Sequence, residues 1–175
     1  RDFLEGRLPA LPGEVATMGD WKDHLSTAFP EVRMKGYLEM RGADAGPQAH
    51  LVALPALWAG LLYDESALDA ALDLIRGWTA ADHQRLRAEV PRLGLRTAAP
   101  GGGTLATLAR AVLAIAAAGL DARGRRDGMG RTEAIHLEPL HSIAQSGITR
   151  AERLLEAFHG PWGGRIDPIW DEAAL

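Results

Sequence analysis

Apolar and polar side chains alternate between Glu31 and Arg41, which is the period-2 pattern of a β-strand with one buried face. The apolar set is Val32, Met34, Leu38 and Met40, and the polar set is Arg33, Lys35, Tyr37, Glu39 and Arg41. The pattern predicts a single strand over this segment. No other segment of the sequence carries a comparable alternation.

Most of the remaining chain has apolar residues at spacings of three and four, the period of an amphipathic helix. Thr79 with Asp82 and Thr149 with Glu152 are spaced as capping boxes, and Pro55 predicts a kink. We expect Asp20 to cap the first helix, Ser66 to open the third and Gly119 to close the fifth. The expected helices cover 20–29, 51–63, 66–75, 79–90, 105–119, 139–147 and 149–160.

These elements predict an α+β protein that is mostly helical and contributes one main strand. We divide it into a connector over 1–19, a helix and strand over 20–46, a helical layer over 47–160 and a tail over 161–175. A lone strand cannot make a sheet, so its apolar face must pair with strands outside this chain or in a partner. Because the sequence also opens at Arg1 without Met, we expect a piece of a longer protein.

Composition narrows the function classes. The 175 residues contain no cysteine, which excludes disulfides, thiolate nucleophiles and zinc-thiolate sites. The net charge of -4 gives no broad basic surface for nucleic acid or anionic lipid. The apolar stretch from Leu51 to Tyr63 is too short to span a membrane, and no signal peptide is recognisable. We therefore expect no nucleic acid, no membrane and a cytoplasmic location.

The polar face of the strand holds the main candidate chemistry. At about 3.3 Å per residue, Glu39 and Arg41 lie roughly 7 Å apart on one face. A cation held by Glu39 and the guanidinium of Arg41 could then grip neighbouring oxygens of one phosphate chain. Arg33 would lie about 26 Å from Arg41 and serve another part of a groove. The alternative interpretation is a solvated polar face.

Three further motifs have simpler interpretations. Gly101-Gly102-Gly103-Thr104 precedes a helix but lacks the Lys-Ser/Thr of a phosphate loop, so it is interpreted as a flexible loop. Glu133-x-x-His136 and Glu138-x-x-His141 point about 140° apart on a helix, which disfavours one shared metal site. The loop with arginines 123, 125, 126 and 131 is interpreted as solvated.

The sequence from Phe29 to Asp44 resembles a segment of the plant and proteobacterial type of glutamate-cysteine ligase. The likeness covers nearly the whole chain and thins between Leu93 and Arg131. It places the chain in the C-terminal part of that enzyme. The other matching runs are Arg1 to Leu4, Ala53 to Ala56, Gly60 to Asp64, Asp73-Leu74, Gly147 to Thr149 and Leu154 to Glu156.

This resemblance implies a glutamine synthetase-like carboxylate-amine ligase fold, with an antiparallel active-site sheet in a single catalytic domain. It implies that ATP phosphorylates the γ-carboxylate of glutamate and that the amine of cysteine displaces phosphate, the first step of glutathione synthesis. Mg²⁺ or Mn²⁺ is the implied cofactor, with Glu39 as a metal ligand and Arg41 stabilising the transferred phosphate. Substrate contacts are expected from Arg33, Tyr37 and Lys35.

The N-terminal part of the same polypeptide is the implied partner, and the isolated chain is expected to be inactive. Two alternatives stay open at this point. One is a carboxylate-amine ligase that uses a different amine, and the other is a non-catalytic helical interaction module that keeps the strand for packing.

Overall fold

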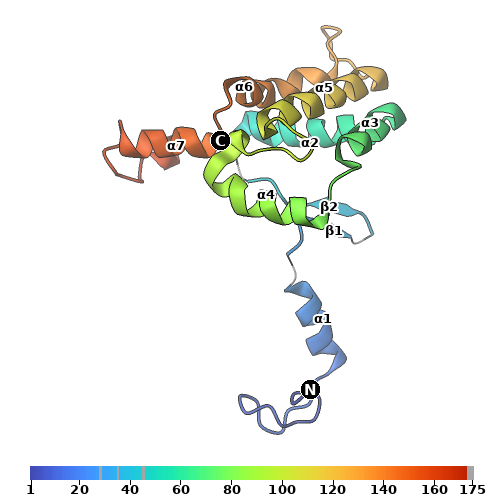
Figure 1. The fold of residues 1–175 in the computed structure, drawn as a ribbon, viewed down its shortest axis with the longest axis vertical. Coiled ribbons are helices and arrows are strands. Elements are labelled where there is room, and N and C mark those ends of the chain that lie inside the picture. The colour runs from blue at the N-terminus through green and yellow to red at the C-terminus, as the bar shows by residue number, and fades with distance from the viewer. Residues whose placement is uncertain (28, 35, 45, 173–175) are drawn as a thin grey trace. The chain divides into compact units, whose positions relative to one another are not determined.

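The computed structural model describes residues 1–27, 29–34, 36–44 and 46–172. The chain divides into two compact units, Arg1–Asp44 and Ala45–Leu175. The first unit holds one helix and two strands, and the second holds the remaining helices (Figure 1). The α+β class with a helical majority is therefore confirmed.

In the first unit, α1 covers Met18–Ser26 and begins with a capping box. The Thr17 hydroxyl accepts a hydrogen bond from the Asp20 amide, and the Asp20 carboxylate accepts one of 2.7 Å from the Thr17 amide. The cap was predicted at Asp20, three residues too late, since Thr17 is the N-cap residue. Asp20 lies inside the first turn and completes the capping box through its side chain. The helix ends before Phe29, so the predicted end was too late.

The expected single strand over Glu31 to Arg41 is wrong. The segment forms a hairpin in which β1 (Val32–Met34) pairs antiparallel with β2 (Leu38–Met40). The register places Val32 opposite Met40 and Met34 opposite Leu38. Each pair joins two even-numbered residues, so the alternation of polar and apolar positions continues unbroken through the turn. The period-2 pattern therefore could not distinguish one strand from two.

The second unit is built from helices (Figure 1). Two short 3₁₀ segments, η1 (Gly94–Arg96) and η2 (Glu133–Leu137), lie between them. The α-helices are α2 (Gln48–Leu62), α3 (Glu65–Ile75), α4 (Ala80–Leu93), α5 (Leu105–Arg123), α6 (Glu138–Ser146), α7 (Arg150–His159) and α8 (Ile169–Glu172).

Helix starts follow local side-chain hydrogen bonds. The capping boxes predicted at Thr79 for α4 and at Thr149 for α7 are confirmed. Helix α3 is capped by Asp64, whose carboxylate accepts from the Ala67 amide at 2.9 Å, so the predicted start at Ser66 was late. The predicted kink residue Pro55 lies inside α2.

The core of the second unit forms where α2 and α5 pack at very close range. A Cβ atom on Gly60 would overlap the Ala116 carbonyl, and one on Gly119 would lie 2.9 Å from the Ala67 Cβ. The predicted stop at Gly119 is thus wrong, because this glycine permits helix contact and α5 continues to Gly124 in the left-handed region. The buried cluster comprises Leu61, Leu113, Ala116, Leu120, Leu137 and Ala144.

Within the described part of the chain, α5 is the one helix long and apolar enough to cross a membrane. Helices α2 and α3 would make a second span only if they were counted together across their 94° bend. One side of α5 packs against α2, α3 and α6.

Candidate active site

The polar face of the hairpin brings together three of the predicted site residues. Arg33 in β1 lies directly opposite Glu39 in β2, and Arg41 follows Glu39 by two residues. The pairing extends one step beyond the strands, where the Arg41 amide donates to the Glu31 carbonyl at 2.7 Å. Glu31 and Arg41 therefore lie next to the pair of Arg33 and Glu39, so that acidic and basic residues alternate on the hairpin.

Arg33 and Glu39 form an ion pair, with the Arg33 Nε 2.6 Å from the Glu39 Oε2. The predicted separation of Arg33 from the rest of the site is wrong, because the hairpin folds it back against Glu39. Both side chains are about one-third exposed, at 31% and 32%. Partial burial and the short distance make this a better-defined pair than a fully solvated one.

Arg41 lies in a half-buried position beside this pair. Its guanidinium carbon is 5.2 Å from the centroid of the Phe29 ring, a cation–π contact. Its Nη1 atom is buried and, among the described residues, has no hydrogen-bond partner. A buried donor without an acceptor is costly, so this atom is suited to an oxygen supplied by a ligand.

The structure describes one of the other two predicted substrate contacts. Tyr37 lies in the bend between the strands and its side chain is exposed. Lys35 lies outside the described residues. The structure therefore brings Arg33, Glu39 and Arg41 together and leaves Tyr37 at the tip of the hairpin.

The apolar face of the hairpin, predicted to be buried, is exposed in this chain. Val32, Met34 and Leu38 are 46%, 81% and 56% exposed. A two-stranded sheet is marginal by itself, and it buries this kind of face by packing against further strands or helices. That the face packs against polypeptide outside this chain stays a prediction.

Metal ligands are sparse in the described residues. They contain no cluster of three or more His, Asp or Glu side chains able to hold a metal ion. Glu133, from one of the Glu-x-x-His motifs, instead faces Arg123 at 3.4 Å. Mg²⁺ commonly takes only one or two protein carboxylates and completes its shell with water and phosphate oxygens. Glu39 fits such a role as a single ligand.

The glycine-rich loop before α5 forms a tight reversal. The Ala99 amide donates to the Gly103 carbonyl at 3.1 Å, and Ala98 pairs with Thr104. Gly101, Gly102 and Gly103 all have positive φ, which explains their residue type. The predicted flexible loop is thus a hairpin-like turn that closes on itself.

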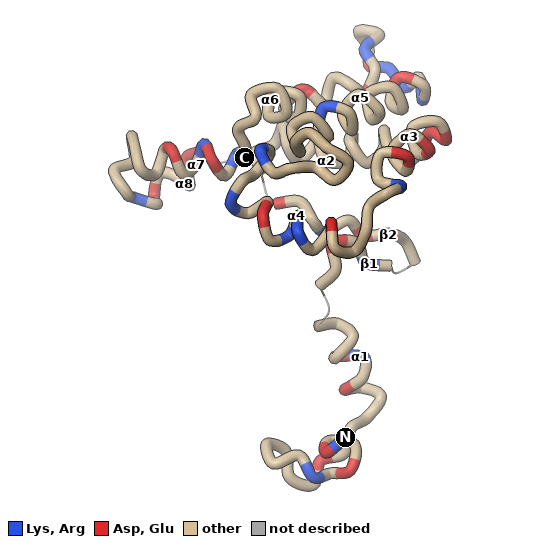
Figure 2. The backbone as a smooth tube through the Cα atoms, in the orientation of Figure 1, with Lys and Arg blue, Asp and Glu red and all other residues tan. Residues whose placement is uncertain are grey.

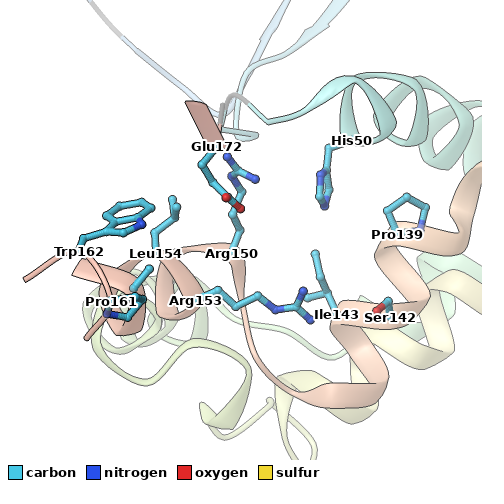
Figure 3. Close-up of a pocket in the computed structure, with 11 residues that line it drawn as sticks. His50, Pro139, Ser142, Ile143, Arg150, Arg153, Leu154, Pro161, Trp162 and Glu172 are labelled. Atoms are coloured by element: carbon cyan, nitrogen blue, oxygen red, sulfur yellow. The ribbon is translucent and has the colours of Figure 1, made fainter. Parts of the chain in front are cut away.

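Sequence reasoning missed a pocket of about 410 Å³ in the helical unit (Figure 3). Its polar lining comes mainly from His50 on α2 and from Arg150 and Arg153 on α7. No motif joins these residues, because about 100 positions separate the two helices in the chain. Their proximity could be found only from the fold.

Comparison with known proteins identifies the family. Residues 7–172 match the model of glutamate-cysteine ligase family 2 (GCS2), and the chain belongs to this family. It is 47% identical to the chloroplastic glutamate-cysteine ligase of Solanum lycopersicum and 48% identical to that of Arabidopsis thaliana. Each alignment covers 98% of this chain and 32% of the relative. The chain thus spans about a third of the length of these relatives.

The expected cytoplasmic location is contradicted by the same comparison. The relatives from Solanum lycopersicum, Arabidopsis thaliana and Brassica juncea are all named as chloroplastic enzymes. The expectation rested on the lack of a recognisable targeting segment. That lack carries no information about location in a chain that spans only part of its relatives.

Proposed function

We propose that the protein containing this chain joins the γ-carboxylate of glutamate to the amine of cysteine, using ATP, as the first step of glutathione synthesis. The observation that carries the proposal is 47–48% identity to two named glutamate-cysteine ligases across 98% of the chain. The matched region of 172 residues spans both the hairpin and the helical unit.

The reaction has two steps. The γ-carboxylate oxygen of glutamate attacks the terminal phosphorus of ATP, which releases ADP and forms an acyl phosphate. The cysteine amine then attacks the acyl carbon, the C–O bond to phosphate breaks, and the nitrogen loses a proton. Both steps depend mainly on positioning and charge neutralisation. A cysteine-free chain can therefore take part, since no protein thiol is required.

Within this chain, Arg41 is the residue best suited to stabilise the transferred phosphoryl group. Its guanidinium is permanently charged, and one buried nitrogen lacks an acceptor among the described residues. The centroid of the Phe29 ring lies 5.2 Å from its guanidinium carbon. A phosphate oxygen within reach of this nitrogen would satisfy the donor and offset part of the charge that develops in the transition state.

Glu39 is proposed to supply one carboxylate oxygen to a bound Mg²⁺ or Mn²⁺. Such an ion, when bound, neutralises charge on the phosphates of ATP. The Nε atom of Arg33 lies 2.6 Å from the Glu39 carboxylate and so positions that carboxylate. The Arg33 guanidinium would also compete with the metal ion for the same carboxylate. Arg33, Tyr37 and Lys35 are proposed to contact substrate or nucleotide along the same hairpin.

The hairpin is proposed to be two strands of a larger antiparallel sheet with the glutamine synthetase-like ligase arrangement. The exposed apolar face of β1 and β2 supports this proposal, since it needs a covering layer. The remaining metal ligands and the nucleotide site would then come from the N-terminal part of the same polypeptide. We expect the isolated chain to be inactive.

The full-length protein tests this function directly. We would incubate it with glutamate, ATP and Mg²⁺ and measure ADP release and γ-glutamylcysteine by mass spectrometry. Cysteine should give the dipeptide and stoichiometric ADP, while glycine, alanine and ammonia should react far more slowly. Equal or faster product formation with another amine would reassign the substrate. No ADP or peptide product with any amine would favour the non-catalytic module.

A further inference from the structure

The pocket in the helical unit is a separate feature of the chain that the ligase chemistry does not explain. It lies within the second compact unit, and the hairpin contributes no residue to it. Its volume of about 410 Å³ falls in the range of small-molecule sites. Its lining includes Pro139, Ile143, Leu154, Ala157, Trp162, Ser142, His50, Arg150, Arg153 and Glu172.

The two arginines that line this pocket have no ion pair among the described residues. By contrast, the half-buried Arg85 and Arg123 are paired with carboxylates, Arg85 with Glu89 at 3.2 Å and Arg123 with Glu133 at 3.4 Å. Arg150 is half-buried, yet among the described residues it has neither an ion pair nor a side-chain hydrogen bond. Arg153, three residues further along α7, is exposed and is likewise unpaired in the described part of the chain.

Both arginines line the pocket from the same helix, α7. Residues three apart lie on the same face of a helix, so both side chains lead into the pocket. Elsewhere along α4 and α7, Lys and Arg residues are mixed with Asp and Glu residues (Figure 2). Glu172 is the one carboxylate among the lining residues, so the lining keeps a net positive charge even with His50 neutral.

His50 supplies a third polar group from the opposite side (Figure 3). Both of its ring nitrogens are buried and have no hydrogen-bond partner within the described residues. Gly46 packs tightly beside it, since a Cβ atom there would lie 2.9 Å from the His50 Cβ. The hydrogen-bonding capacity of the ring is thus unused within the described residues.

We propose that this pocket binds a small molecule that carries an oxyanion, carboxylate or phosphate, on an apolar body. The guanidinium groups of Arg150 and Arg153 match such an anion by charge-assisted hydrogen bonds. Trp162, Leu154 and Ile143 provide an apolar wall for the attached body. The pocket thereby combines apolar walls with a few convergent polar groups, as small-ligand sites do.

Binding of phenyl phosphate to the full-length protein that contains this chain tests the proposal by calorimetry. Inorganic phosphate and phenol serve as the anion-only and body-only probes. We expect saturable binding of phenyl phosphate that is tighter than that of either probe. The double variant Arg150→Gln/Arg153→Gln should weaken it at least about tenfold. The control Arg125→Gln changes an exposed arginine outside the pocket and should leave binding unchanged.

A second variant tests the pocket without changing any charged residue. Ala157→Met fills the pocket from α7 and should also abolish phenyl phosphate binding, with thermal unfolding recorded for every variant to verify folding. Absence of saturable binding would overturn the proposal. Equal binding by the double variant and the Arg125→Gln control would overturn it as well, since the anion would then be held elsewhere.

Discussion

The Nε atom of Arg33 lies 2.6 Å from a carboxylate oxygen of Glu39, across the two strands of the hairpin. This contact joins a proposed substrate-binding residue to the proposed metal ligand. Arg41 lies two residues beyond Glu39, with a buried nitrogen free of acceptors among the described residues. The local charge pattern is therefore built within eleven residues, Glu31 to Arg41, and needs no contribution from the helices.

Removing the Glu39 charge should impair metal use by the full-length enzyme. In the Glu39→Gln variant we expect the Mg²⁺ concentration for half-maximal activity to rise at least about tenfold, because an amide is a much weaker ligand than a carboxylate. Steady-state rates across a Mg²⁺ titration measure this. Glu89→Gln is the matched control, since Glu89 also pairs with an arginine at 3.2 Å but lies outside the site. A similar Mg²⁺ dependence in both variants would remove Glu39 from the metal site.

Changing Arg33 should separate its two proposed roles. In the Arg33→Gln variant, Glu39 loses its paired cation, so the half-saturating Mg²⁺ concentration should fall. The KM for glutamate or ATP should rise about tenfold if Arg33 also holds a substrate anion. Arg76→Gln, which disrupts an exposed ion pair with Asp73, provides the control. An unchanged KM for both substrates would leave Arg33 as a positioning residue only.

The close contact of α2 with α5 predicts a large effect from one methyl group. Gly119→Ala should lower the free energy of unfolding by about 1–3 kcal/mol or more, because the added Cβ overlaps the α2 backbone and the helices must separate. Urea unfolding measures the change. Gly77→Ala is the control, since a Cβ atom there meets nothing within 4 Å. Equal stability of the two variants would contradict the close packing described here.

The capping box of α7 predicts a loss of stability in acid. The Thr149 amide, the Thr149 hydroxyl and Arg96 donate to Glu152, in this order of importance, and hold its pKa below the ordinary 4.5. Ionised Glu152 therefore contributes stability above pH 4.5, and the contribution is lost as the pH falls through the lowered folded-state pKa.

Thermal unfolding between pH 6 and pH 3 measures this contribution. Glu152→Gln keeps an acceptor for Thr149 but does not titrate, so its Tm should fall less with acid than that of the unchanged chain. Asp20, Asp82 and Asp127 also have lowered pKa values and are present in both proteins, so their effects cancel in the comparison. Parallel Tm profiles would show that Glu152 contributes nothing.

Short-range features were predictable from the sequence. The capping boxes at Thr79 and Thr149 depend only on residues three apart, and both formed as expected. Features set by tertiary contact were not. Gly119 has the residue type of a helix stop, and only the proximity of Gly60 shows that it serves packing instead.

The candidate site was predictable in its residues but not in its shape. Alternation placed Glu39 and Arg41 on one face, and family resemblance pointed to their chemistry. The same alternation hid the turn near Gly36, because residues that pair across this hairpin have the same parity. The pocket formed by His50 and Arg150 had no local signal, since the two residues come from helices far apart in the chain.

The kcat of the full-length enzyme carrying Arg41→Lys tests the central claim most directly. Lysine keeps the charge but loses the planar fork that grips phosphate oxygens, so kcat should fall about 100-fold or more. Arg76→Lys, at an exposed arginine, should stay within about threefold of the unchanged enzyme, and circular dichroism would verify folding of both. An Arg41→Lys enzyme that is folded and retains its full kcat would contradict the assignment of this hairpin to catalysis.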